Sequence, residues 1–208
     1  MKKITLILAL LSAVILSGCA SRSESAPSAL DVIMARTSIR SFTGDPVSKE
    51  QLETILKAGM AAPSAMNVQP WRFVVVTDKE KIAEVFGSGF RGEMFTQAGA
   101  VIVVCGETKM MRKPFGQPDA PEEEMSNIFW FEDCSAATEN ILLAVKALGL
   151  GAVWTAGYPA AERTAPIAAA LGIPEGTDIL CVIPVGVPAE DPEPKDKWKP
   201  ENIHWEKW

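Results

Sequence analysis

Hydrophobic residues recur along this chain at two spacings, and each spacing predicts a different kind of element. Leu52, Ile55 and Leu56 are three and four residues apart, which places their side chains on one face of a helix. The sequence Ser48–Gln51 before them is a capping box and Pro63 ends the pattern, so we expect a helix between these limits. Uninterrupted apolar runs rich in Val and Ile instead predict buried strands.

The same two patterns divide the rest of the chain. Further helices are expected over residues 28–36, 79–86, 128–148 and 160–171, the last of them interrupted by Pro166. Strands are expected over residues 72–77, 100–105, 152–155 and 178–187. Residues 107–124 are polar, charged and Pro-rich, which predicts a loop or excursion. Because helices and strands mix without a regular βαβ order, the fold class is α+β.

The first residues have the pattern of a signal peptide. Lys2 and Lys3 precede the apolar run Ile4–Leu16, whose 13 residues are too few for the ~20 that cross a bilayer. The run ends in Leu16–Cys19, which resembles a bacterial lipobox and implies cleavage before a lipidated Cys19. The alternative is an ordinary secretory signal with an incidental Cys. We expect a signal peptide at 1–18, the lipidated Cys and a tether at 19–27, and one domain at 28–208.

Cleavage changes the charge of the chain. Removing residues 1–18 leaves 190 of 208 residues and takes two of the 20 Lys and Arg, so the balance against 26 Asp and Glu is −8. An acidic chain lacks the basic footprint of a nucleic-acid binder and gains nothing from anionic headgroups. Membrane attachment is therefore expected through the lipid alone, in a bacterial cell envelope.

Several chemistries have weak support in the sequence. Cys105, Cys134 and Cys181 lie in apolar patterns and are expected in the core, without the spacing of a metal site. His204 is the single His, which argues against a Ser-His-Asp mechanism. Gly87–Gly92 matches G-x-G-x-x-G but follows a helical pattern, whereas a dinucleotide fingerprint follows a strand, so a flexible loop is expected.

Two polar clusters are candidates for binding. Arg36 and Arg40 flank Ser38 where a helix ends, and two planar guanidinium forks beside a hydroxyl suit a phosphate monoester. The alternative is a solvated basic helix end. In the second cluster, Ala62–Trp71, a Pro ends a helix and polar amides lead into a strand. Such amides can form hydrogen bonds with the edge of a flat heterocycle. The alternative is that the segment simply connects a helix to a strand.

Together, in this order, the two clusters resemble the nitroreductase family of FMN enzymes. Asp133–Ala137 with Glu139–Ala144 is similar to the family's long core helix, and Gly149–Trp154 to the helix exit and next strand. The resemblance covers roughly Leu30 to the C-terminus. It implies a central, mostly antiparallel sheet flanked by helices. It also implies a homodimer with two FMN sites at the subunit interface, each formed by residues of both chains.

The resemblance implies roles for the first cluster and for the chain's end. Arg36, Thr37 and Ser38 map to the phosphate-binding segment, and Arg40 to a cation near the pyrimidine edge that stabilises reduced flavin. The C-terminal arm is expected to exchange between subunits, since it carries three of the six Trp residues. Its phosphate contact is expected from Lys197 or Lys199, each of which is otherwise a solvated Lys.

Further roles follow from the resemblance. Pro63, Ser64 and Asn67 map to a loop that approaches the flavin from the other subunit. The positions near flavin N5, where a backbone N–H is presented, are Thr155, Ala156 and Gly157. Many family members have Glu where this chain has Ala156.

The remaining candidates lie around the flavin face. Phe129 and Trp130, at the end of the 109–130 segment, are possible lids over it or core aromatics. Arg91 is a weaker candidate for the flavin edge.

The implied reaction is a ping-pong hydride transfer. NAD(P)H reduces the flavin and leaves, and an electron-poor acceptor such as a nitroaromatic or quinone then takes the electrons. One alternative is a flavin-binding or small-molecule-binding lipoprotein without turnover. Ala156 and the expected envelope location suggest this alternative. Another is reductive dehalogenation or flavin breakdown on the same fold.

Overall fold

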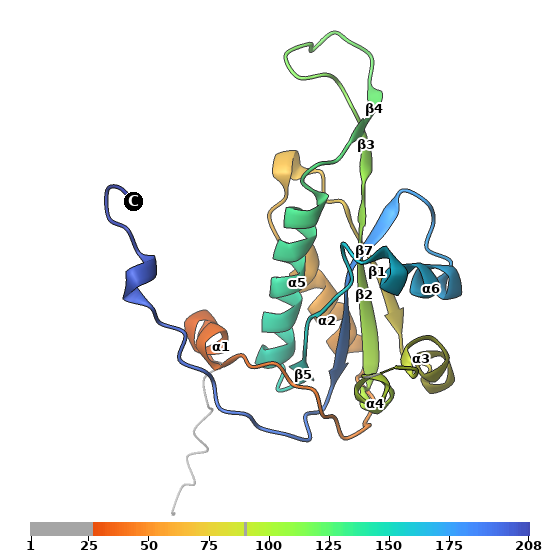
Figure 1. Cartoon of the computed structure of the whole chain (residues 1–208), viewed down its shortest axis with the longest axis vertical. Helices are drawn as coiled ribbons and strands as arrows, with labels where there is room; N and C mark the ends of the chain where they lie inside the picture. Colours follow the sequence, from red (N-terminus) through yellow and green to blue (C-terminus); the bar gives the residue numbers. More distant parts are fainter. Residues whose placement is uncertain (1–26, 90) are drawn as a thin grey trace, which may run out of the picture.

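The computed structural model describes residues 27–89 and 91–208, and a five-stranded sheet forms its centre (Figure 1). Every strand pair in this sheet is antiparallel, which confirms the expected α+β class. The order is β1 (Trp71–Val76), β2 (Ala100–Glu107), β7 (Thr177–Gly186) and β5 (Gly151–Ala152), with β6 (Thr155–Ala156) also paired to β7. The predicted signal peptide, Cys19 and most of the tether lie outside the described residues.

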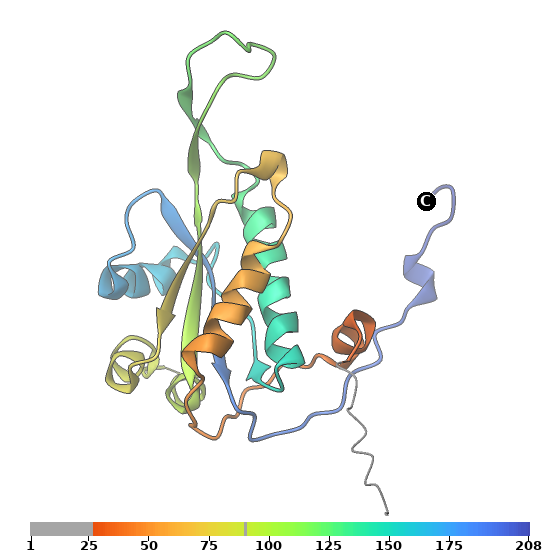
Figure 2. The same ribbon diagram turned by 180° about the vertical axis from the view of Figure 1, so that it is seen from behind.

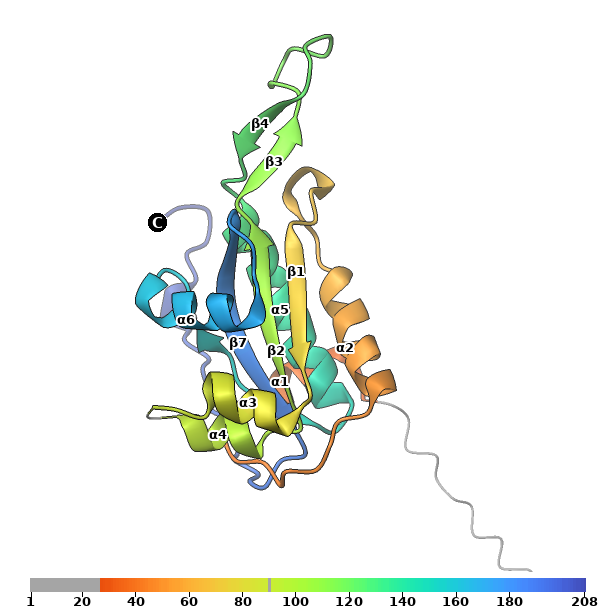
Figure 3. The ribbon, with the colours of Figure 1, turned by 90° about the vertical axis from the view of Figure 1, so that its right-hand side faces the viewer.

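Helices cover both faces of the sheet (Figures 1 and 3). One layer holds α2 (Lys49–Met60) and the long α5 (Trp130–Ala147). The other holds α3 (Lys79–Phe86), α4 (Gly92–Gln97) and α6 (Ala161–Leu171). The short α1 (Ala29–Ala35) lies beside α5, and two 3₁₀ turns complete the described helices, η1 (Ala65–Asn67) and η2 (Pro200–Asn202).

The central strand β2 is buried on both sides. Ile102 and Val104 belong to the core under α2 and α5, while Val101, Val103 and Cys105 belong to the core under α3 and α6. Successive side chains of a strand point to opposite faces, so a strand between two helical layers must be apolar at every position. This explains the uninterrupted run that predicted the strand.

The predicted core thiols are buried, as expected. Burial raises the pKa of Cys105, Cys134 and Cys181 to about 12 in each case. All three are free cysteines. A thiol with so high a pKa carries almost no thiolate at neutral pH, so these residues are packing groups.

The 107–124 segment is an excursion from the sheet, as expected, but its two strands were not predicted. Residues in this segment form a hairpin of β3 (Lys109–Arg112) and β4 (Glu123–Ser126), which projects beyond the sheet (Figure 1). Its strands lack a buried face, so they show no apolar alternation to detect. A cross-strand ion pair from Lys109 Nζ to Glu124 Oε1, at 2.8 Å, connects the two strands instead.

Three other elements differ from the prediction. The third strand is split into β5 and β6, which keep one register against β7 on either side of the buried Val153. Helix α4 was not predicted. Helix α6 continues through Pro166, because the carbonyl that Pro166 leaves unpaired belongs to Glu162, in the exposed first turn where water can reach it.

The C-terminal arm, residues 188–208, runs away from the body past α1 (Figures 1 and 2). Trp198, Trp205 and Trp208 on the arm are 70%, 80% and 98% exposed. Within the ranges 27–89 and 91–208, the helices are too short or too polar to span a membrane.

Candidate functional site

The segment from Arg36 to Arg40 is fixed against the sheet at its middle. Arg36 ends α1, and the Ile39 N–H donates to the Ala152 carbonyl at 3.0 Å. The Ile39 side chain is buried so closely on Gly151 that a Cβ there would lie 2.7 Å from Ile39 Cγ2. In an extended segment the neighbouring side chains point the other way, so Ser38 and Arg40 face outward.

Outward of this segment lies a cavity of about 380 Å³, and most of the residues predicted to bind the FMN phosphate line it. Its walls are the 36–40 segment and the start of the arm, and it is lined by Arg36, Thr37, Ser38, Arg40, Glu190, Pro192, Glu193, Lys195 and Lys197. Lys199 does not line it, since this residue lies further along the arm at the start of η2. Of the two predicted Lys candidates, the structure therefore places Lys197 with the arginines.

Carboxylates hold the cationic side of this cavity in place. Arg36 Nε lies 3.5 Å from Glu139 Oε1 on α5, and the Arg36 side chain is only 19% exposed. Glu190 Oε1 accepts hydrogen bonds from the backbone N–H groups of Arg40 and Ser41. The arm residue Glu190 thus joins the 36–40 segment to the arm, a contact that sequence reasoning missed.

A second cavity has a volume of about 1020 Å³, and Arg40 lines it as well as the first. Thr155, Ala156 and Gly157 line it, as do the ends of α3, α4 and α6. The Gly157 N–H already donates to the Leu180 carbonyl at 2.9 Å, which fixes this wall to β7. Ala156 is exposed, so a small side chain borders the cavity at this position.

Arg91 lines the larger cavity, as does Arg163 on α6. The segment Gly87–Gly92 connects α3 to α4, which confirms that the G-x-G-x-x-G match does not follow a strand. Arg163 was missed, because folding alone brings the first turn of α6 to this place.

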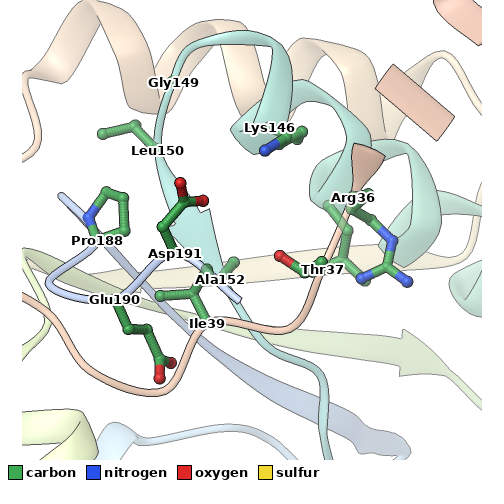
Figure 4. A pocket seen from close by; sticks show the side chains of 11 residues that line it. Arg36, Thr37, Ile39, Lys146, Gly149, Leu150, Ala152, Pro188, Glu190 and Asp191 are labelled. Atoms are coloured by element: carbon green, nitrogen blue, oxygen red, sulfur yellow. The ribbon is translucent and has the colours of Figure 1, made fainter. Parts of the chain in front are cut away.

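A third cavity, of only about 70 Å³, lies behind the 36–40 segment (Figure 4). Lys146 of α5 and Asp191 of the arm line it, together with Leu150. Its volume suits a few water molecules rather than a nucleotide.

The loop with Pro63, Ser64 and Asn67 lies at the start of α5, whereas α1 lies beside the other end of that helix (Figure 1). Arg36, which follows α1, pairs with Glu139 in the middle of α5. The Ala65 N–H donates to Asp133 Oδ1 at 2.8 Å, and Asp133 is in the first turn of that helix. Within a single chain these loop residues therefore line neither binding cavity.

This loop has an unusual backbone conformation, and two of its side chains have hydrogen-bond donors that face no acceptor in the described residues. Met66, Asn67 and Gln69 have φ values of 54°, 57° and 53°, a region that costs free energy for residues other than Gly. Ser64 Oγ accepts from the Gln69 N–H at 3.1 Å, and Asn67 Oδ1 accepts from Gln69 Nε2 at 2.9 Å. The Ser64 hydroxyl hydrogen and the Asn67 amide hydrogens remain for a ligand or partner.

Asp133 should control the stability of this loop in a pH-dependent way. It is 5% exposed, and burial raises the pKa of its carboxyl, with Glu132 adding to the rise. A raised folded-state pKa stabilises the fold below the ordinary value, and this contribution is lost as pH rises through the folded-state pKa. Asp133→Asn keeps the acceptor for Ala65 and stays neutral, so we expect its stability relative to wild type to increase as pH rises above the ordinary Asp pKa of about 4.

Urea unfolding at several pH values measures this difference. Asp133→Ala is the matched control, since it leaves the Ala65 N–H without its acceptor and should cost about 1–3 kcal/mol. Equal losses for the Asn and Ala variants at pH 7 would contradict the assigned role.

Of the two predicted lid residues, Trp130 is a core residue. It is 7% exposed and packs edge-on against Tyr158 with ring centroids 5.0 Å apart. Phe129 is 40% exposed at the start of α5. In the part of the chain that the structure describes, no cluster of three or more metal-ligating side chains occurs.

Comparison with known proteins identifies the family. The model of the nitroreductase family matches residues 33–91 and 86–187. This chain belongs to the nitroreductase family. A protein of Archaeoglobus fulgidus, provisionally named NADH dehydrogenase/NAD(P)H nitroreductase, is 41% identical over 182 residues, which are 86% of this chain and 98% of that protein.

Solved structures of similar proteins have the same fold as this nitroreductase-family chain. A Bacteroides thetaiotaomicron protein with the same provisional name is 38% identical, with a TM-score of 0.76 over 88% of this chain and all of that one. An FMN-dependent nitroreductase of Clostridium difficile is 25% identical, with a TM-score of 0.71 over 86% of this chain and 99% of that chain. The nitroreductase-like fold expected from the motifs is thereby confirmed.

Proposed function

We propose that this protein reduces electron-poor small molecules, such as nitroaromatics or quinones, by a ping-pong transfer of hydride from NAD(P)H through bound FMN. As a nitroreductase-family member the chain is an NAD(P)H oxidoreductase with FMN as its cofactor. One observation carries the placement of the flavin: Arg40 lines both the cavity with Arg36, Ser38 and Lys197 and the larger cavity with Thr155 to Gly157. A nucleotide with a phosphate at one end and a flat ring at the other has this division of chemistry.

The side chains present fit FMN. Arg36, Ser38 and Lys197 offer charged and hydroxyl donors to a phosphate, and charge-assisted hydrogen bonds are the strong ones. The larger cavity has the volume of a typical small-molecule site and is bordered by the backbone of Thr155 to Gly157.

The chain's own residues would bind the FMN, orient it and adjust its reduction potential. FMN, when bound, supplies the chemistry of accepting a hydride and passing it on. Arg40 places a positive charge between the two cavities, where it stabilises negative charge on the ring system. The described residues that line the larger cavity include no Asp, Glu, His or Lys, so the protein contributes position and water exclusion rather than an acid or base.

The second subunit completes the proposed site. Family members are typically homodimers. Pro63, Ser64 and Asn67 line neither cavity within one chain, so a partner's loop is the source we propose for these contacts. Exchange of the Trp-rich arm is part of the same proposal, because exposed Trp side chains are costly in water.

A spectrum and a reduction assay test this function. The protein purified without residues 1–18 should be yellow, or become yellow with FMN. NADH or NADPH should bleach the flavin, and a nitroaromatic should restore the colour. A colourless protein that takes up no FMN would sink the proposal. Bleaching without acceptor-dependent recovery would favour a binding lipoprotein, and product analysis distinguishes dehalogenation or flavin breakdown.

We also propose that Cys19 anchors the enzyme to the bacterial cell envelope as a lipoprotein. The support is the lipobox-like Leu16–Cys19 after a short apolar run. More than one acyl chain gives durable attachment, which the acidic domain itself would not provide.

Cys19→Ser should abolish lipid attachment. Cells given labelled palmitate should transfer label to the wild-type protein and not to this variant, which should keep its signal peptide. Cys105→Ser, a change at a buried thiol, is the control and should stay labelled. Undiminished labelling of Cys19→Ser would refute the anchor.

A further inference from the structure

The larger cavity has an unbalanced charge. Arg40, Arg91 and Arg163 line it, and its described lining residues include no carboxylate. Arg163 Nε does lie 3.9 Å from Glu162 Oε1, but both side chains are about three-quarters exposed, at 70% and 75%. Exposed pairs of this kind are weak, so Glu162 does not cancel the positive charge.

The three arginines come from separate parts of the fold. Arg40 follows α1, Arg91 begins α4, and Arg163 lies in the first turn of α6. Helices α3, α4 and α6 cover the same face of the sheet (Figure 3). Residues of all three helices line the cavity, together with β6 and Val182 of β7. Arg91 and Arg163 therefore reach one cavity from two different helices.

Bound FMN leaves two of these charges unused. In the proposed function, on which this inference rests, the phosphate lies with Arg36, Ser38 and Lys197, and Arg40 borders the ring. The oxidised ring system is neutral. Arg91 and Arg163 also line this cavity and have no part in that arrangement, so their charges are available to a second molecule.

We infer that Arg91 and Arg163 form an anion subsite, which selects substrates that carry a carboxylate or phosphate group. Guanidinium groups bind both anions through paired N–H donors. The same chemistry suits an acidic substituent on an acceptor and the pyrophosphate of a nicotinamide dinucleotide. The two half-reactions separate these sources.

Two acceptors of matched size measure the selectivity. Enzyme reduced photochemically without a nucleotide is mixed with 4-nitrobenzoate or with 4-nitrobenzyl alcohol, and flavin reoxidation is followed. We expect the anion to react with the higher kcat/KM, and this preference to fall by about fivefold or more in Arg91→Gln/Arg163→Gln, the size expected for two exposed charge pairs. The control variant Arg112→Gln, on the distant hairpin, should retain the wild-type preference for the anionic acceptor.

The reductive half-reaction provides the second arm. NADH bleaching of the oxidised flavin is compared in the same variants, and a loss here assigns the subsite to the donor's pyrophosphate. Rising ionic strength should weaken the affected reaction in the wild-type enzyme, because mobile ions screen exposed charges. This measurement does not depend on the variants folding.

The outcomes are distinct for the two proposals. A protein that binds flavin and reduces 4-nitrobenzyl alcohol, but shows no anion preference and no difference between variants in either half-reaction, overturns the anion subsite alone. Equal losses for charged and neutral acceptors overturn it too. A protein without flavin or turnover overturns the proposed function, and the subsite with it.

Discussion

Arg36→Ala should lower the affinity for FMN by about 10- to 100-fold, the loss expected for a hydrogen bond to a charged group. The side chain is 19% exposed, so its charge is poorly replaced by solvent. It also lies with Ser38 and Lys197 around the cavity proposed for the phosphate. Removing it leaves a doubly charged phosphate with fewer donors.

Glu139 makes this substitution more severe. Its carboxylate lies 3.5 Å from Arg36 Nε, so without Arg36 an uncompensated negative charge remains near the phosphate. The double variant Arg36→Ala/Glu139→Ala should therefore bind FMN more tightly than Arg36→Ala alone. A double-mutant cycle isolates this coupling, because the two side chains are in direct contact.

Fluorescence quenching of FMN during titration gives the dissociation constants. Arg36→Lys keeps the charge without the planar fork and should have an intermediate affinity. Arg112→Ala, on the projecting hairpin, is the control for a general loss of positive charge. If dialysed Arg36→Ala retains as much flavin as wild type, Arg36 does not bind the phosphate.

Ile141→Ala should cost about 3 kcal/mol of unfolding free energy and lower Tm by about 6–12 °C. The side chain is fully buried in the core between the sheet and the layer of α2 and α5. Gly59 of α2 packs so closely that a Cβ there would lie 2.9 Å from Ile141 Cγ1. With helices already this close, the cavity left by the substitution has little room to collapse.

Guanidinium unfolding measures the loss as a lower midpoint with an unchanged slope. Ile128→Ala is the matched control, since this side chain is 70% exposed just before the same helix and should change stability by about 0.5 kcal/mol or less. Equal losses at both positions would show that Ile141 does not pack as described.

Local patterns accounted for most elements of the fold. Helix α2 was predictable because its apolar spacing, capping box and terminating Pro63 all agree, and both capping-box bonds at Ser48 are present. The β3–β4 hairpin was not, because strands without a buried face leave no periodic signal. A single Pro is a weaker guide than several agreeing signals, as helix α6 shows by continuing through Pro166.

Some residues of the candidate site were likewise predictable from the sequence, and others were not. Arg36, Ser38 and Arg40 are close in sequence, so a motif could reveal them. Glu139 is over a hundred positions away from its partner Arg36, and Arg163 reaches its cavity only through the packing of α6. Contacts of this kind depend on tertiary structure, and no spacing in one sequence encodes them.

The exposed Trp side chains of the arm have a consequence for assembly in the cell. In a single chain, Trp198, Trp205 and Trp208 present exposed aromatic surface to the surroundings. The proposed exchange of the arm would cover this surface with a second copy. Pairing is a bimolecular event whose speed rises with the density of chains. A lipid tether would confine the chains to two dimensions, so molecules too dilute to meet in bulk fluid would encounter one another by lateral diffusion.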